Sequence, residues 1–241
     1  MSALAHMLET RGTPTVAIGL VRPQIERTRP PRGLSTPFQL GRPLGEPGDP
    51  DFQRRVLMHA LGLLERHDGP VILEDFPDDP PNWSDAPAWQ PPQLPPIEAP
   101  GAPEGCEEFL GREMAALHPA WRRAVARYGR TTTGLSGQAP ELWPSCIGRF
   151  LAGELPIVPP HQTAALTLRF LCDDIKAMYS EAAQADDMPP SSRQIDTWFW
   201  SRTIAGQLLI ALRSLALQSD NNALKTVGAR FFVPAPFLPE G

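Results

Sequence analysis

The sequence predicts an α/β protein: a small, partial parallel sheet of doubly wound type, then a proline-rich connection and an all-helical domain. Three observations carry this prediction. Strand-like and helix-like segments alternate over residues 1–80. Eleven of the thirty prolines fall within residues 70–103. Residues 105–241 carry long apolar stripes at helical spacing. We therefore expect an α/β domain at 1–80, a connection at 81–104 and a helical domain at 105–241.

The first domain is expected to order its elements as strand, helix, strand, helix, strand. The longest helix is predicted from Phe52, Val56 and Leu61, which lie at helical spacing. This order implies a parallel sheet with right-handed crossovers. Helices are expected over 3–11 and 51–66, a crossover helix or a turn over 24–29, and strands over 13–21, 33–38 and 71–77.

The connection cannot be a helix or a central strand, because proline lacks the N–H donor and fixes φ. It should run extended, partly as polyproline II. Trp83 and Trp89 lie inside it. Since a free linker rarely carries two tryptophans, we expect this segment to lie against a domain or a partner.

The second domain is expected to be helical throughout. Ser191 and Gln194 fit a capping box at the start of the last long helix. Pro119 should strain or break the first helix. Helices are expected over 107–128, 141–151, 162–185, 192–218 and 223–231.

Composition excludes several classes of function. The net charge is −5 and no basic patch dominates, so neither nucleic acid nor an anionic membrane is expected as a partner. No apolar run approaches the ~18 residues of a membrane span. Three widely spaced cysteines form neither a disulfide framework nor a zinc pattern. We expect a cytoplasmic chain with reduced thiols.

A first candidate site lies at the carboxyl edge of the sheet, where open α/β sheets bind ligands. Arg22 and Arg42 could hold a carboxylate, and Glu74 or Asp75 could handle an amine or a proton. An ordinary charged surface loop is the alternative. The residues predicted here are Arg22, Gln39, Gly41, Arg42, Gly45, Glu74 and Asp75.

A second candidate site lies on the helix expected over 162–185. Asp174 and Glu181 are two turns apart and within about 20° of each other around the helix. Two such carboxylates could bind a metal or act as acid and base. A half-exposed pair that binds arginine is the commoner arrangement.

A third candidate site lies on the helix expected over 192–218, at Arg193, Trp198 and Arg202. Arg202 projects into an apolar face, and a buried guanidinium needs a carboxylate. Asp174 or Glu181 is the expected partner. The alternatives are therefore a structural ion pair and a ligand clamp.

Other chemistry has little support in the sequence. The five histidines lack metal-binding spacing, so no metal site is predicted. The cysteines lack a neighbouring histidine or a C-x-x-C partner, so a nucleophilic role is not expected. The sequence identifies no cofactor.

One part of the chain resembles a known family. The segments 11–16, 31–34 and 37–45, together with the helix at 53–61, resemble the B component of glycine/sarcosine/betaine and D-proline reductases. The likeness covers about residues 3–76. It implies a fold fragment with the loop at 38–45 near an active site, and a small amino-acid-like or carboxylate substrate.

The resemblance carries over no catalytic residue. In the family, a selenocysteine or cysteine motif precedes the first helix, and none of Cys106, Cys146 and Cys172 occupies that place. We therefore expect a subunit or a diverged member of a reductase-like enzyme that lacks the catalytic thiol. Either the helical domain covers one edge of the narrow sheet, or a second chain or a homo-oligomer completes the sheet. The alternatives are a non-catalytic small-molecule-binding or assembly protein and a stand-alone enzyme that uses Asp174 and Glu181.

Overall fold

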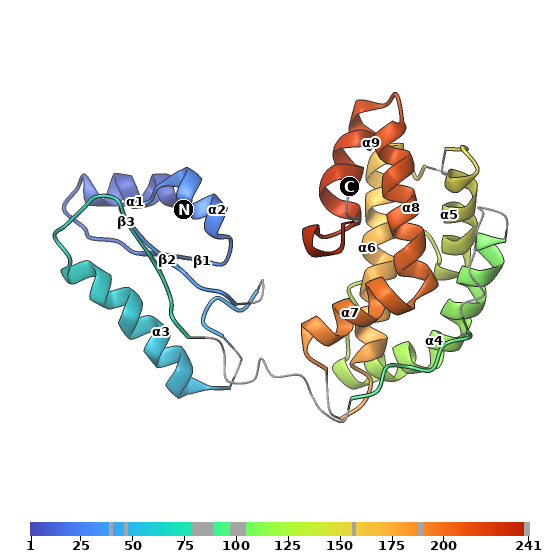
Figure 1. The fold of residues 1–241 in the computed structure, drawn as a ribbon, viewed down its shortest axis with the longest axis horizontal. Coiled ribbons are helices and arrows are strands. Elements are labelled where there is room, and N and C mark those ends of the chain that lie inside the picture. The colour runs from blue at the N-terminus through green and yellow to red at the C-terminus, as the bar shows by residue number, and fades with distance from the viewer. Residues whose placement is uncertain are drawn as a thin grey trace. The chain divides into compact units, whose positions relative to one another are not determined.

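The computed structural model describes residues 1–38, 41–45, 48–78, 89–96, 105–155, 158–187 and 190–238. The chain divides into two compact units, Met1–Ser84 and Asp85–Gly241 (Figure 1). The first unit is α/β and the second is helical, so the predicted fold class is confirmed.

The first unit is a three-stranded parallel sheet with helices on both faces. The strands lie in the order β1-β2-β3, and Ala17 pairs with Gly33 while Gly33 pairs with Leu73. Its elements are α1 (Ser2–Glu9), β1 (Ala17–Gly19), α2 (Arg22–Thr28), β2 (Arg32–Ser35), α3 (Pro50–Gly62) and β3 (Ile72–Asp75).

The two crossover helices cover opposite faces of this sheet (Figure 1). Gly33 faces Ile25 of α2, because a Cβ on Gly33 would lie 2.9 Å from the Ile25 side chain. Leu34, the next residue, packs in one cluster with Phe52 of α3. Since the strand order runs in one direction, the two crossovers have opposite hands. The expectation that both are right-handed is wrong for one of them.

Helix α3 forms because its start is capped and one of its faces is apolar. The Asp49 side chain accepts a hydrogen bond from Phe52 N at 3.0 Å, and Pro50 occupies the first turn. Phe52 then packs with Phe38 and Phe76 at ring-centroid distances of 5.4 and 5.9 Å. These aromatic contacts join α3 to the ends of β2 and β3.

The second unit is a bundle around one apolar core. Tyr179 and Trp143 are among its fully buried side chains. Its first helix runs unbroken through Pro119. The helices are α4 (Cys106–Tyr128), α5 (Trp143–Leu151), α6 (Ala164–Ala183), α7 (Ser192–Arg202), α8 (Ile204–Gln218) and α9 (Asn222–Val227).

The single helix predicted over 192–218 is wrong, because the chain breaks at Thr203. Thr203 is extended, with φ −120° and ψ 147°. Its hydroxyl donates to Phe199 O at 2.6 Å and accepts from Gly206 N at 2.9 Å. Thr203 thereby ends α7 and caps α8. Gly206 permits the corner, since a Cβ there would lie 2.2 Å from Phe199 O.

Residues 89–96 of the proline-rich connection lie against the second unit, as predicted for Trp89. Trp89 Nε1 donates to Ala183 O at 3.3 Å. Its ring meets the Trp198 ring edge-on at 6.3 Å, and Leu94 also packs against the core. Trp83 lies outside the described residues.

Candidate functional site

An open groove of about 290 Å³ runs along α7, between this helix and the proline-rich segment. We call it the α7 groove. It brings together the three residues predicted for the third candidate site, with four others. The groove is lined by Trp89, Pro91, Arg193, Gln194, Thr197, Trp198 and Arg202.

The groove has a rigid aromatic wall. Trp198 is 4% exposed. The centroid of its ring is 6.3 Å from that of Trp89 and 6.0 Å from that of Tyr179. The start of α7 is also fixed, because Gln194 N donates to Ser191 Oγ and Ser191 N donates to Gln194 Oε1. The apolar part of the groove is therefore pre-formed before any ligand arrives.

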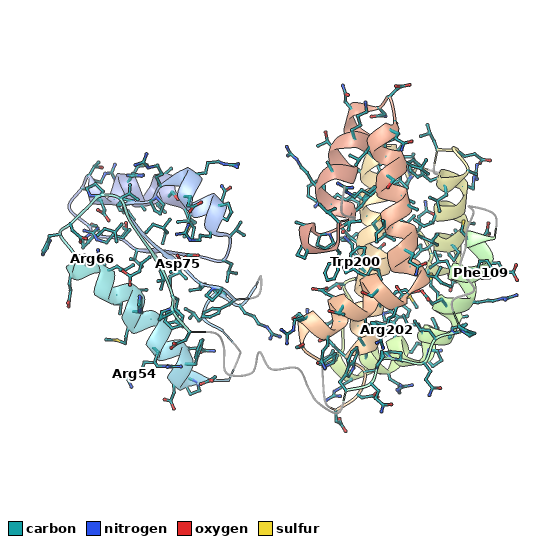
Figure 2. All side chains as sticks on the ribbon, in the orientation of Figure 1. Arg54, Arg66, Asp75, Phe109, Trp200 and Arg202 are labelled. Carbon is teal, nitrogen blue, oxygen red and sulfur yellow. The ribbon has the colours of Figure 1, made fainter. Side chains whose placement is uncertain are left out.

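Arg202 projects from α7 as an exposed side chain at the groove (Figure 2). The prediction that it is buried and paired with Asp174 or Glu181 is wrong, because both carboxylates have other partners. Among the described residues, no ion pair or hydrogen bond of Arg202 is found. Helical spacing assigned Arg202 to an apolar face, but α7 ends at this residue.

Asp174 is fully buried and anchors a loop. Its carboxylate accepts from Gly134 N at 2.8 Å, Leu135 N at 2.9 Å and Ser136 N at 2.9 Å. Ser136 Oγ adds a fourth hydrogen bond at 2.6 Å. Both carboxylate oxygens therefore already have donors.

Glu181 anchors the same loop two turns further along α6. It accepts from Trp121 Nε1 at 2.8 Å, Thr131 Oγ1 at 2.8 Å and Thr132 N at 2.6 Å. Burial by itself would raise the pKa of Glu181, but these hydrogen bonds lower it overall. Within the part of the chain that the structure describes, no group of three His, Cys, Asp or Glu residues is placed to hold a metal ion.

At the carboxyl edge of the sheet, the structure brings Arg22 and Asp75 together. Arg22 Nε donates to the two Asp75 oxygens at 2.7 and 3.0 Å, and Arg22 also binds Glu26. The hydrogen bond from Arg22 is the main reason that the pKa of Asp75 lies below its usual range. Two carboxylates thus already neutralise this guanidinium.

Glu74 does not join this pair. Neighbouring residues in a strand point to opposite faces, and Glu74 lies on the α3 side. His59 Nε2 lies 2.7 Å from one of its oxygens and Arg66 Nη1 lies 2.8 Å from the other. The two acidic residues predicted as one site are therefore separated by the sheet.

The glycine-containing loop packs against the core. Gly45 has φ +91°, and a Cβ there would lie 2.7 Å from the Phe52 ring. Its N–H donates to Arg42 O at 3.0 Å, which closes a turn. Gly41 is exposed with φ +90°, and Gln39 lies outside the described residues.

The cavity found in the first unit lies at the other end of the sheet. Its volume is about 160 Å³, and Arg32 and Ile72, which begin β2 and β3, line it together with Glu9. Arg32 Nη1 donates to Glu9 at 2.6 Å. The described part of the predicted carboxyl-edge site therefore does not coincide with this cavity.

All three cysteines are buried. Burial raises the pKa of the Cys106 and Cys146 thiols, and it raises that of Cys172 to about 12. Since the thiolate is the nucleophile, these thiols are poorly suited to catalysis.

Sequence reasoning missed the buried carboxylate of Glu113. It is fully buried on α4 and accepts from Tyr179 Oη at 2.6 Å, Ile204 N at 2.8 Å and Ala205 N at 3.0 Å. Burial is the main reason that its pKa is raised. The sequence does hold a signal for the burial of Glu113, because this residue lies between Leu110 and Leu117 on the apolar stripe of its helix.

Comparison with known proteins found no match: no family model, no curated protein and no solved structure is similar to this chain. No helix in the described ranges is both long and apolar enough to cross a bilayer.

Proposed function

We propose that the protein is a non-catalytic binding protein whose α7 groove takes a small carboxylate-bearing compound with an apolar part. One observation carries the proposal: the exposed guanidinium of Arg202 lies beside the aromatic wall made by Trp89 and Trp198. A guanidinium presents paired N–H donors that match a carboxylate. Indole rings supply apolar contact area at little cost in conformational entropy.

The state of the predicted acids supports binding rather than catalysis. A general acid or base must reach the substrate with an available oxygen or proton. Asp174 and Glu181 accept hydrogen bonds on both oxygens from the loop at 131–137. Asp75 is paired with Arg22, and Glu74 contacts two basic side chains. Each of these carboxylates has a structural role that explains its position.

The test is ligand-induced stabilisation measured by thermal unfolding of the full chain. The probe is indole-3-acetate, and the neutral control is tryptophol, which keeps the ring but lacks the carboxylate. We expect a concentration-dependent rise in Tm with indole-3-acetate alone. Arg202→Met should abolish this rise. Arg230→Met, a matched change at an exposed arginine that does not line the groove, should retain it. Equal stabilisation of wild type and Arg202→Met would overturn the groove assignment.

A second candidate is a subunit of a reductase-like enzyme that acts on a small amino-acid-like compound. It is favoured by the narrow sheet, in which β1 and β3 each pair with β2 alone among the described strands. The burial of all three thiols adds the requirement that another chain supply the reactive thiol. Native mass spectrometry of the protein from its own host tests this candidate. A complex with a thiol-bearing second chain is the expected result, and an isolated monomer counts against it.

A further inference from the structure

The two arginines of the α7 groove lie at different ends of it. Arg193 and Arg202 are nine residues apart on one helix, and both line the groove. At 100° and 1.5 Å per residue, their Cα atoms are about half a turn apart around the helix and about 13 Å apart along it. Trp198 lies between them in the sequence and forms the wall of the groove.

This spacing limits what one anionic group can do. A single carboxylate could contact both guanidinium groups only if both side chains extended fully towards each other past Trp198. Two carboxylates at the two ends of a longer molecule would each meet one arginine without that constraint. Between the ends, such a molecule would cross the half-buried side chains of Trp89 and Pro91 and the small exposed part of Trp198.

We infer that the ligand of the α7 groove is an elongated dicarboxylate with an apolar middle. The inference rests on the proposed function and specifies its ligand class. The charge distribution on α7 agrees with it. Asp196, the acidic residue of this helix, does not line the groove, although it lies three residues from Arg193 and about 60° from it by helical position. Both charged side chains that line the groove are therefore cationic.

Isothermal titration calorimetry of the full chain with three probes tests the inference. Sebacate has two carboxylates joined by a long alkyl chain, decanoate has the same chain length with one carboxylate, and succinate has two carboxylates that are close together. We expect sebacate to bind at least about tenfold more tightly than either of the others, since each arginine adds one charge-assisted contact.

Variants show whether both ends are used. Arg193→Met and Arg202→Met should each reduce the affinity for sebacate to about that for decanoate, whereas Arg230→Met should leave it unchanged. Both groove arginines are exposed, so neither change should unfold the protein, and circular dichroism checks this. Loss of sebacate selectivity in only one of the two variants would contradict a two-ended ligand.

The outcomes separate this inference from the proposed function. Equal binding of sebacate and decanoate, lost in Arg202→Met, would overturn the dicarboxylate and keep the carboxylate site. No binding of either probe or of indole-3-acetate would overturn both. Tighter binding of an end-blocked peptide with two glutamates flanking a proline-rich middle would show that the ligand is a protein segment, which overturns the small-molecule ligand.

Discussion

The carboxylate of Glu113 and the hydroxyl of Tyr179 lie 2.6 Å apart in the buried centre of the helical unit. The same carboxylate accepts from the first two N–H groups of α8, at Ile204 and Ala205. These N–H groups have no partner within their own helix, and a negative charge at a helix N-terminus is favourable. One side chain thus connects α4, α6 and α8 at the corner where α7 ends.

Replacing Glu113 with glutamine should destabilise the helical unit. All three neighbours are donors, so the glutamine NH2 group would face another donor and leave buried polar groups unpaired. We expect a loss of about 2–3 kcal/mol in the free energy of unfolding, measured by urea denaturation. Glu108→Gln, an exposed acid on the same helix, should change stability by less than about 0.5 kcal/mol. Equal effects of the two changes would contradict the role of Glu113.

Replacing Gly206 with alanine should disturb the corner between α7 and α8. A Cβ at this position would meet Phe199 O at 2.2 Å, and a backbone atom cannot move aside cheaply. We expect a loss of more than about 2 kcal/mol in thermal or urea unfolding. Gly111→Ala is the matched control, because its nearest neighbour would be Pro144 at 3.9 Å. That change should be neutral or stabilise α4 by up to about 1 kcal/mol.

Acidification should release the 131–137 loop through Glu181. Its pKa is lower in the folded chain than its ordinary value. Its contribution to stability is therefore complete above the unfolded pKa of about 4.3 and is lost as the pH falls through the folded pKa. The pKa of Glu113 is raised in the folded chain, so its contribution to stability changes with pH in the opposite direction. The measurement is accordingly the difference between wild type and Glu181→Gln.

In urea titrations from pH 7 to pH 3, this difference should shrink as the pH falls below about 5. The exposed control Glu141→Gln should change stability by less than about 0.5 kcal/mol at pH 7. A difference between wild type and Glu181→Gln that does not change with pH would show that Glu181 does not ionise differently on folding.

Replacing Trp89 with alanine should release the proline-rich segment from the bundle. The variant loses the hydrogen bond to Ala183 O and the edge-on contact with Trp198. We expect faster proteolytic cleavage within residues 89–96 and loss of binding in the α7 groove, because one of its walls is removed. Gln90→Ala changes an exposed neighbour and should leave both properties as in wild type. Unchanged cleavage in Trp89→Ala would mean that Trp89 does not hold the segment.

Local patterns in the sequence predicted much of the fold. The alternation around β1, β2 and β3 and the apolar stripes of α4 and α6 each depend on residues close together in the chain, and all of these elements formed. The capping box at Ser191 depends on residues three apart and also formed. Arg193, Trp198 and Arg202 line one groove for the same reason, since one short helix carries all three.

The partner of each charged group depended on tertiary structure. Helical spacing put Asp174 and Glu181 on one face, but most of their partners come from a loop about forty to fifty residues earlier in the chain, and Trp121 of α4 supplies another. Spacing could not reveal that Glu113 would cap α8, or that Thr203 would end α7.

The sequence by itself therefore determined which segments are helices and strands, because helix and strand periods are local properties. Only the tertiary structure decided which carboxylates serve as internal anchors and which arginine side chains lie exposed at the α7 groove. The physical reason is that a buried charge takes whichever donors packing brings within about 3 Å. Those donors are backbone N–H groups and side chains whose positions no local pattern encodes.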